Sequence, residues 1–316
     1  MEQDSPLIPD SKSVSPSSNK SRTISIVVTV ISIVVVLVSC LSYSVLIVKE
    51  RAKYFERDTQ VSIDGGIVQG YKVGRVSVFK GIPYAKPPVE KRRWSVPEPC
   101  RVGDCWKGIF NATQFGEKCF QTDALNRSIT NGKEDCLFIN VVTPRSETEG
   151  KLPVLVFIHG GSLIYGSGNE LGLFPNPELI SELKIVGVSF NYRLNAFGFL
   201  ALDALAKLSF TSTSGNYGFM DQILALKWVQ ENIGKFGGDP KRVTLLGQSS
   251  GGTSELALLS SPLAKGLFHG VIMMSASAIY NKSAGDASRD NEIFLKNCNC
   301  QKLDVNSTLT VNFHFF

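Results

Sequence analysis

Histidine is scarce in this sequence, with only three in 316 residues, at positions 159, 269 and 314. The imidazole of histidine is a frequent metal ligand and the most frequent general base, so this scarcity limits both kinds of chemistry. The cysteines do not compensate, because none forms a C-x-x-C pair and no histidine stands near the clustered ones. We therefore expect no metal site and no cofactor.

Charge is also sparse, and it is scattered along the chain. Charged residues make up 19% and apolar residues 43%, a balance typical of a globular body rather than a disordered chain. The net charge is +5, but the basic residues form no stripe with interleaved aromatic residues. We therefore predict no nucleic-acid partner. The length suits one large domain or two ordinary ones.

One stretch lacks charge altogether. Residues 24–48, ISIVVTVISIVVVLVSCLSYSVLIV, hold 25 residues without a charged side chain. At 1.5 Å of rise per residue, a helix of this length exceeds a bilayer core of about 30 Å. A cleaved signal peptide is the alternative, but its apolar core is usually about 7–15 residues long. We therefore predict an uncleaved signal-anchor helix over residues 23–48, in contact with the lipid bilayer.

The segments beside this span bear on its orientation. Residues 1–22 are rich in serine, proline and charge and predict a disordered tail, and residues 49–58 predict a charged stalk. The basic residues of the stalk lean weakly toward a cytosolic C-terminus. Four Asn-x-Ser/Thr sequons and clustered cysteines after the span outweigh this bias. We predict a single-pass type II protein with a cytosolic N-terminus and a lumenal or extracellular body, glycosylated at Asn111, Asn126, Asn281 and Asn306.

From residue 59 onward the pattern is that of a folded body. Residues 61–85 contain β-favouring runs broken by glycine turns, which predict short antiparallel strands. Later apolar runs bounded by turn residues predict strands buried on both faces, as in a mainly parallel sheet. Between two such runs, residues 216–236 carry apolar side chains at helical spacing: Phe219, Ile223, Leu226, Val229 and Ile233. This alternation predicts an α/β sandwich over residues 59–300.

A serine between two glycines follows one of the buried runs. In Gly247-Gln248-Ser249-Ser250-Gly251 a strand pattern precedes the serine and a helical pattern follows it, which is the context of a G-x-S-x-G nucleophile elbow. The glycines would let the neighbouring backbone pass without a Cβ clash. The partial positive charge of the helix N-terminus would favour an oxyanion beside Ser249. Alone the motif is weak, because a Gly/Ser turn is its usual explanation.

A second glycine-rich element strengthens this interpretation. His159-Gly160-Gly161 ends another buried run. An oxyanion hole needs backbone N–H groups that are free to point into a cavity, and glycines permit this approach. Two such elements in this order, each after a buried strand, favour an acyl-transfer site over two ordinary loops.

Longer stretches resemble the type B carboxylesterase/cholinesterase family of α/β-hydrolases. They are FKGIPYAKPP (79–88), EDCLFINV (134–141), FIHGGS (157–162), NYRLNAFGFL (191–200), GNYGFMDQ (215–222) and VTLLGQSSGG (243–252). Over about residues 60–280, this resemblance implies the N-terminal half of an α/β-hydrolase three-layer sandwich with an incomplete sheet. It implies Ser249 as the nucleophile and an oxyanion hole made by the backbone N–H groups of Gly161, Ser162 and Ser250.

The resemblance implies further contacts around the site. It suggests a disulfide between Cys119 and Cys136, and the loop that this bond would close contains no tryptophan. Cholinesterases hold choline by cation–π attraction to a tryptophan in this loop, which argues against a choline ester as substrate. Cys100 and Cys105 are expected to pair locally. Two buried ion pairs are implied as well, Arg93 with Glu134 and Arg193 with Asp221.

The general base is the part that the sequence does not supply clearly. In α/β-hydrolases the acid and the histidine follow the serine. His269 comes too soon and is interpreted as structural, while His159 precedes the serine and is expected to shape its turn. Asp304 and His314 have the required order but lie in residues 301–316, which have lost the family pattern. We therefore interpret the chain as a truncated product whose acid and histidine are missing.

Three classes of function follow from these observations, the third being a truncated decoy or non-functional product. The first is a membrane-anchored serine carboxylesterase that forms an acyl-enzyme with a small-molecule ester, this chain being inactive alone. The second is a non-catalytic adhesion or receptor ectodomain, resembling neurotactin, with a protein partner. The intact serine motif favours the enzyme, because an adhesion module has no need of Ser249.

Overall fold

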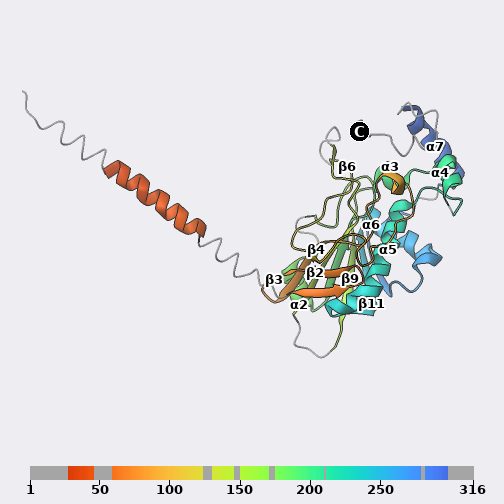
Figure 1. Ribbon diagram of the computed structural model, residues 1–316. Helices are drawn as coiled ribbons and strands as arrows, with labels where there is room; N and C mark the ends of the chain where they lie inside the picture. Colours follow the sequence, from red (N-terminus) through yellow and green to blue (C-terminus); the bar gives the residue numbers. More distant parts are fainter. Residues whose placement is uncertain are drawn as a thin grey trace, which may run out of the picture. The chain divides into compact units, whose positions relative to one another are not determined.

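A computed structural model (Figure 1) describes residues 28–45, 59–123, 130–145, 150–170, 175–209, 211–278 and 282–297. The chain divides into two units, Met1–Lys53 and Tyr54–Phe316. Each unit is described by itself.

The first unit contains the helix Val28–Val45. Its 18 residues have a mean hydropathy of 2.4 and none is buried, so it is long and apolar enough to cross a membrane or to act as a signal sequence. Three of its serine hydroxyls, those of Ser32, Ser39 and Ser44, donate to carbonyl oxygens four residues earlier, at 2.8–2.9 Å. Such bonds let hydroxyl groups lie in apolar surroundings.

A seven-stranded sheet forms the centre of the second unit. Its strands, in spatial order, are β12 (Gly270–Met274), β11 (Gly238–Gln248), β9 (Leu152–Ile158), β10 (Val186–Phe190), β8 (Phe138–Pro144), β4 (Val76–Pro83) and β3 (Tyr71–Val73). From β12 to β10 all neighbours pair in parallel, whereas from β10 to β3 all pairs are antiparallel. The expected mainly parallel sheet is right for the half that leads to Ser249 and wrong for β8, which pairs antiparallel with both neighbours, whereas the antiparallel pairing of β3 with β4 is as residues 61–85 predict. A continuous apolar run reports burial on both faces and not strand direction.

Smaller sheets flank the central one. β1 (Gln60–Ile63) and β2 (Gly66–Gln69) form an antiparallel hairpin, as the glycine turn between them predicts, and β5 (Ile109–Asn111) extends it. β6 (Gln121–Thr122) pairs with β7 (Thr130–Asn131), and η1 (Glu90–Arg92) is a single 3₁₀ turn.

Helices cover both faces of the central sheet. One core cluster brings Ile180 of α2 (Pro177–Leu183) against β4, β8 and β9. The other brings α5 (Tyr217–Asn232), with η2 (Ile233–Phe236), and α6 (Ser250–Ser260), with η3 (Pro262–Ala264), against the opposite face. The remaining helices are α3 (Asn195–Phe199), α4 (Asp203–Leu208) and α7 (Ala284–Asn297). This three-layer arrangement is the predicted α/β sandwich (Figure 1).

The expected helical stripe is α5 with its 3₁₀ extension. Ile223, Leu226, Val229 and Ile233 are buried in the core, as their spacing predicts. Phe219 is only half-buried, because it lies in the first turn of α5 and lines a cavity instead.

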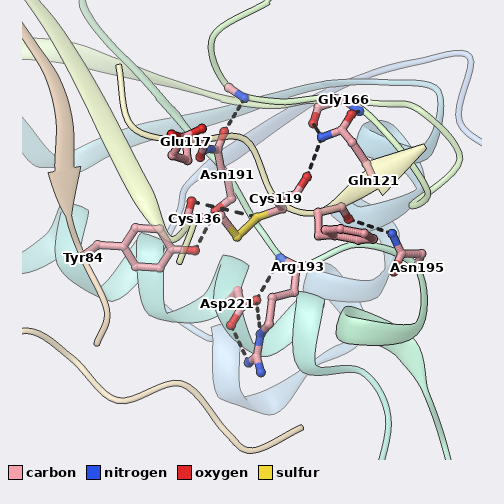
Figure 2. Close-up of a disulfide and its surroundings, with 12 residues drawn as sticks. Tyr84, Glu117, Cys119, Gln121, Cys136, Gly166, Asn191, Arg193, Asn195 and Asp221 are labelled. Atoms are coloured by element: carbon pink, nitrogen blue, oxygen red, sulfur yellow. Dashed lines mark hydrogen bonds and ion pairs between the residues drawn. A yellow bond between two sulfur atoms is a disulfide. The ribbon is translucent and has the colours of Figure 1, made fainter. Parts of the chain in front are cut away.

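Both expected ion pairs are present. Arg193 Nη2 lies 2.7 Å from Asp221 Oδ1, and the side chains are 3% and 0% exposed. The Arg193 Nε and backbone N–H also donate to Asp221 Oδ2, at 2.8 and 3.0 Å. Arg93 binds both carboxylate oxygens of Glu134, at 2.5 and 2.6 Å, in a less buried setting. The buried pair fixes the segment after β10 to α5, below the disulfide in Figure 2.

Candidate active site

Ser249 occupies a strained turn between a strand and a helix. β11 ends at Gln248 and α6 begins at Ser250, so a single residue changes the chain direction. Ser249 has φ 57° and ψ −123°, a combination that residues with a Cβ rarely adopt. Hydrogen bonds hold both of its backbone groups: its N–H donates to Met274 O at 2.8 Å, and its carbonyl accepts from Thr253 N–H at 3.0 Å. The surroundings therefore fix this conformation, and the side chain remains partly exposed.

The glycines around Ser249 make the turn sterically feasible. A Cβ at Gly247 would lie 2.5 Å from the Gly251 carbonyl carbon. A Cβ at Gly251 would overlap the carbonyl oxygen of Ile158, the last residue of β9. The first turn of α6 therefore lies directly against β9, and no larger residue fits at either position.

A loop with donor groups runs beside the nucleophile turn. After β9, a Cβ at Gly160 would lie 2.5 Å from Gln248 O and 3.3 Å from Ser249 Cβ. Within the described residues, the backbone N–H groups of Gly161, Ser162 and Ser250 donate to no hydrogen-bond acceptor. Unused amide donors beside a serine are the components from which an oxyanion hole is built. The structure thus brings the loop and the serine turn together, as the two sequence elements predict.

His159 is a structural part of this loop. It is buried, its Nδ1 lies 2.8 Å from Gly160 O, and its ring stacks on Tyr192 with centroids 4.3 Å apart and planes at 16°. Burial lowers the pKa of His159 to about 4, so its imidazole is neutral at pH 7. These contacts support the expected role in shaping the turn.

The other histidines do not complete the site. His269 Nδ1 accepts from the backbone N–H of Val243 at 3.4 Å, near the start of the buried part of β11. Ser249 lies beyond the opposite end of that strand, about 15–20 Å away at the rise of a β-strand. Asp304 and His314 lie outside the described residues. In the described part of the chain, no histidine forms a hydrogen bond with Ser249.

A disulfide fixes the loop that borders the site (Figure 2). Cys119 and Cys136 are bonded with Cα atoms 4.8 Å apart, and Cys100 and Cys105 form a second bridge. Gln121, which follows the first of these cysteines, donates to Gly166 O at 3.0 Å and accepts from Gly166 N–H at 2.8 Å. The disulfide loop therefore supports the far end of the loop that carries the free N–H groups. Cys298 and Cys300 lie outside the described residues.

A cavity of about 960 Å³ opens beside the serine turn. Ser162 and Thr253 line it close to Ser249, and its apolar wall is made of Leu163, Ile164, Phe199 and Phe219. Lys282, Asp286 and Asn291, from α7 or the segment before it, form a polar wall. This volume is at the upper end of the range for small-molecule sites. Sequence reasoning assigned Phe219 to the core, because helical spacing does not reveal where a helix passes beyond its sheet.

A buried carboxyl group that sequence reasoning missed lies in α6. Glu255 has no exposed surface, and neither of its carboxylate oxygens has a hydrogen-bond partner within the described residues. Burial raises the pKa of Glu255 to about 8, so the side chain is protonated at neutral pH. Four residues after Gly251, it lies on the side of α6 that faces the sheet.

Substituting Glu255 by glutamine is expected to change how stability depends on pH. In the unfolded chain this group loses its proton above the ordinary glutamate pKa of 4.5, whereas the folded chain keeps the proton up to about pH 8. The free energy of unfolding should therefore fall as pH rises through this window, and stay lower above it. Glutamine does not titrate, so E255Q avoids this loss. The free energy of unfolding of E255Q, relative to that of wild type, should therefore be about 2–4 kcal/mol higher at pH 8.5 than at pH 5.

The measurement is unfolding of the full chain in detergent, followed by tryptophan fluorescence, because Trp94, Trp106 and Trp228 all lie in the second unit. Glu182→Gln, at an exposed position of α2, is the matched control and should leave the pH profile unchanged. Parallel pH profiles for E255Q and wild type would show that burial of Glu255 has no such effect.

Comparisons with known proteins match the same part of the chain. The carboxylesterase family matches residues 57–311. The para-nitrobenzyl esterase of Bacillus subtilis (strain 168) is 44% identical over 222 residues, covering 69% of this chain and 44% of the esterase. The liver carboxylesterase of Sus scrofa is 39% identical over 217 residues, covering 65% of this chain and 36% of that protein.

The solved structure of a thermophilic PNB esterase superposes with a TM-score of 0.73 at 38% sequence identity. The match covers 81% of this chain and 52% of that structure. The chain therefore spans about half, or less, of the length of the relatives that it matches.

Proposed function

Because the chain belongs to the carboxylesterase family, we propose that it carries the nucleophile and oxyanion-hole part of a serine carboxylic ester hydrolase. The observation that carries this proposal is the strained Ser249 beside the unused N–H groups of Gly161, Ser162 and Ser250. In this proposal Ser249 Oγ attacks the ester carbonyl carbon, and the three amides stabilise the resulting oxyanion. Loss of the alcohol leaves an acyl-enzyme, which water hydrolyses.

The proton acceptor is the component that limits this reaction. A serine hydroxyl is a weak nucleophile without an adjacent base. Neither histidine in the described part of the chain forms a hydrogen bond with Ser249, and the Asp304–His314 pair lies outside that part. We therefore propose that the chain alone supports only slow hydrolysis, in which Ser249 attacks without a dedicated base and the oxyanion hole stabilises the intermediate.

Substrate and location follow as further parts of the proposal. The apolar wall of the cavity suits the acyl or alcohol group of a small organic ester. The relatives are named for substrates as different as para-nitrobenzyl esters and fatty acyl-CoA, so no single ester is assigned. The named relatives do not favour the adhesion alternative.

The proposed topology is a type II membrane protein with its N-terminus in the cytosol. Residues 1–22 form the tail, 23–48 the anchor and 49–58 the stalk, followed by the esterase body over 59–300 and the divergent segment 301–316. The apolar helix, the disulfides and the exposed Asn111 support this placement. The other sequons lie outside the described residues. Glycosidase digestion of the full chain made in eukaryotic cells tests it, since a cytosolic body would show no mobility shift.

Hydrolysis of p-nitrophenyl esters by the full chain in detergent tests the proposed activity. Wild type should release p-nitrophenol at least tenfold faster than Ser249→Ala, because only wild type can form the acyl-enzyme. Ser254→Ala, a buried serine of the same helix, is the matched control and should keep most of the rate. His314→Ala should also leave the rate unchanged if the tail does not supply the base. Equal rates for wild type and S249A would exclude a catalytic Ser249 in this chain.

A further inference from the structure

The loop that carries the proposed oxyanion donors is itself strained. Ser162 and Leu163 both have left-handed backbone conformations, with φ 58° and 61°. Residues with a Cβ seldom adopt this conformation, and two in succession need support from their surroundings. The loop's own turn, in which Ile164 and Tyr165 N–H donate to Gly161 O, does not connect it to the nucleophile.

Ser250 provides a connection between the loop and the nucleophile turn. Its side-chain oxygen accepts a hydrogen bond from the backbone N–H of Leu163 at 3.3 Å, and the residue is 4% exposed. Ser250 directly follows Ser249 and begins α6. The bond therefore joins the end of the strained loop segment to the residue beside the nucleophile.

Tyr192 continues this connection to the start of the loop. Its phenol O–H donates to His159 O at 2.7 Å, while its ring stacks on the His159 imidazole. Burial raises the pKa of Tyr192, so its phenol keeps the proton that it donates at neutral pH.

The two hydroxyls hold the loop at two separate points. Leu163 N–H donates to Ser250 Oγ at one end of the loop, and the Tyr192 hydroxyl donates to His159 O at the other. Both side chains are buried, where a hydrogen bond is electrostatically stronger than in water. The two bonds therefore hold the loop at both ends.

We propose that the side-chain hydroxyls of Ser250 and Tyr192 are positioning groups, which hold both ends of loop 159–163 against the nucleophile turn. By fixing the loop, they direct the Gly161 and Ser162 N–H groups toward the reacting oxygen. The effect on catalysis rests on the proposed function, whereas the effect of the two hydroxyls on the position of the loop does not. The Ser250 side chain thus acts apart from its own backbone N–H, which any residue at this position would provide.

The test compares Ser250→Ala and Tyr192→Phe in the full chain in detergent. S250A keeps the backbone N–H, and Y192F keeps the ring that stacks on His159. Ser254→Ala is the matched control, because its buried hydroxyl bonds to Ser250 O and Gln222 but to no loop residue. Tryptophan fluorescence melts establish that each variant is folded.

The first readout is hydrogen exchange at the Leu163 amide, measured by mass spectrometry with single-residue fragmentation. Loss of the Leu163 hydrogen bond should speed this exchange about five- to tenfold in S250A, with no change in S254A. Y192F removes the other attachment of the loop, at His159 O, and should also speed exchange at Leu163. The double variant should exchange faster than either single variant, since the two bonds hold the loop at separate points. Wild-type exchange in both single variants would overturn the proposal.

The second readout is inactivation by a fluorophosphonate, separated into a maximal rate and an inhibitor affinity. Misdirected oxyanion donors should lower the maximal rate about five- to tenfold and leave the affinity unchanged. Faster exchange with an unchanged maximal rate would overturn the positioning role. If wild type itself does not react, the proposed function fails, and amide exchange alone then decides whether Ser250 and Tyr192 hold the loop.

Discussion

Replacing Asp221 by asparagine is expected to lower the free energy of unfolding by about 3–5 kcal/mol, because it leaves the Arg193 guanidinium buried without its counter-charge. The pair is 3% and 0% exposed, so water cannot take the place of the lost carboxylate. Arg193 also donates to Ser95 O at 2.9 Å, so its guanidinium links three segments. Asparagine has nearly the same shape as aspartate, so the loss of stability comes from the missing charge and not from a cavity.

Chemical unfolding of the full chain in detergent, followed by tryptophan fluorescence, measures this loss. The control is Glu231→Gln, which removes the partner of Arg101 in an exposed pair whose side chains are 41% and 51% exposed. Water replaces that interaction, and the change should stay below about 1 kcal/mol. A D221N variant as stable as the E231Q variant would show that the buried pair does not hold the core.

Replacing Gly251 by alanine is expected to reduce the reactivity of Ser249 about 100-fold or more. The new Cβ would overlap Ile158 O and lie 3.0 Å from His159 O, so α6 must move away from β9. That movement displaces Ser249 and the Ser250 N–H relative to the loop, and a displacement of about 1 Å can cost about 100-fold in rate. Overpacking should also cost about 1–3 kcal/mol of stability.

The matched control for this substitution is Gly285→Ala in α7. A Cβ there would meet only the flexible end of Arg289, at 3.6 Å, and alanine favours a helix more than glycine does. Fluorophosphonate inactivation rates of both variants give the comparison. If G251A reacts at the wild-type rate, the close contact between α6 and β9 does not position the nucleophile.

The sequence predicted the nucleophile turn well, because its determinants are local. Gly247, Ser249 and Gly251 lie within five positions, and the strand and helix patterns on either side fix their context. The same holds for α5, whose apolar spacing identifies its buried face. Strand direction was less accessible, since β8 and β10 are equally apolar although β8 pairs antiparallel with its neighbours.

Contacts between distant positions could not be derived from patterns. Arg193 and Asp221 are 28 positions apart, and only the family resemblance suggested their pairing. Tyr192 and Ser250 are brought together by the register of β9, β10 and β11, which no local pattern encodes. The burial of Glu255 could not be predicted either, because a charged residue type predicts an exposed position.

The residue that a fluorophosphonate modifies in the full chain shows most directly which serine is reactive. We expect the turn and its neighbouring amides to activate Ser249 alone among nearby serines. Peptide mass spectrometry after labelling should place the phosphonyl group on Ser249, with Ser250 and Ser254 unmodified, and S249A should take up none. Equal labelling of S249A, or a label on another serine, would contradict the account.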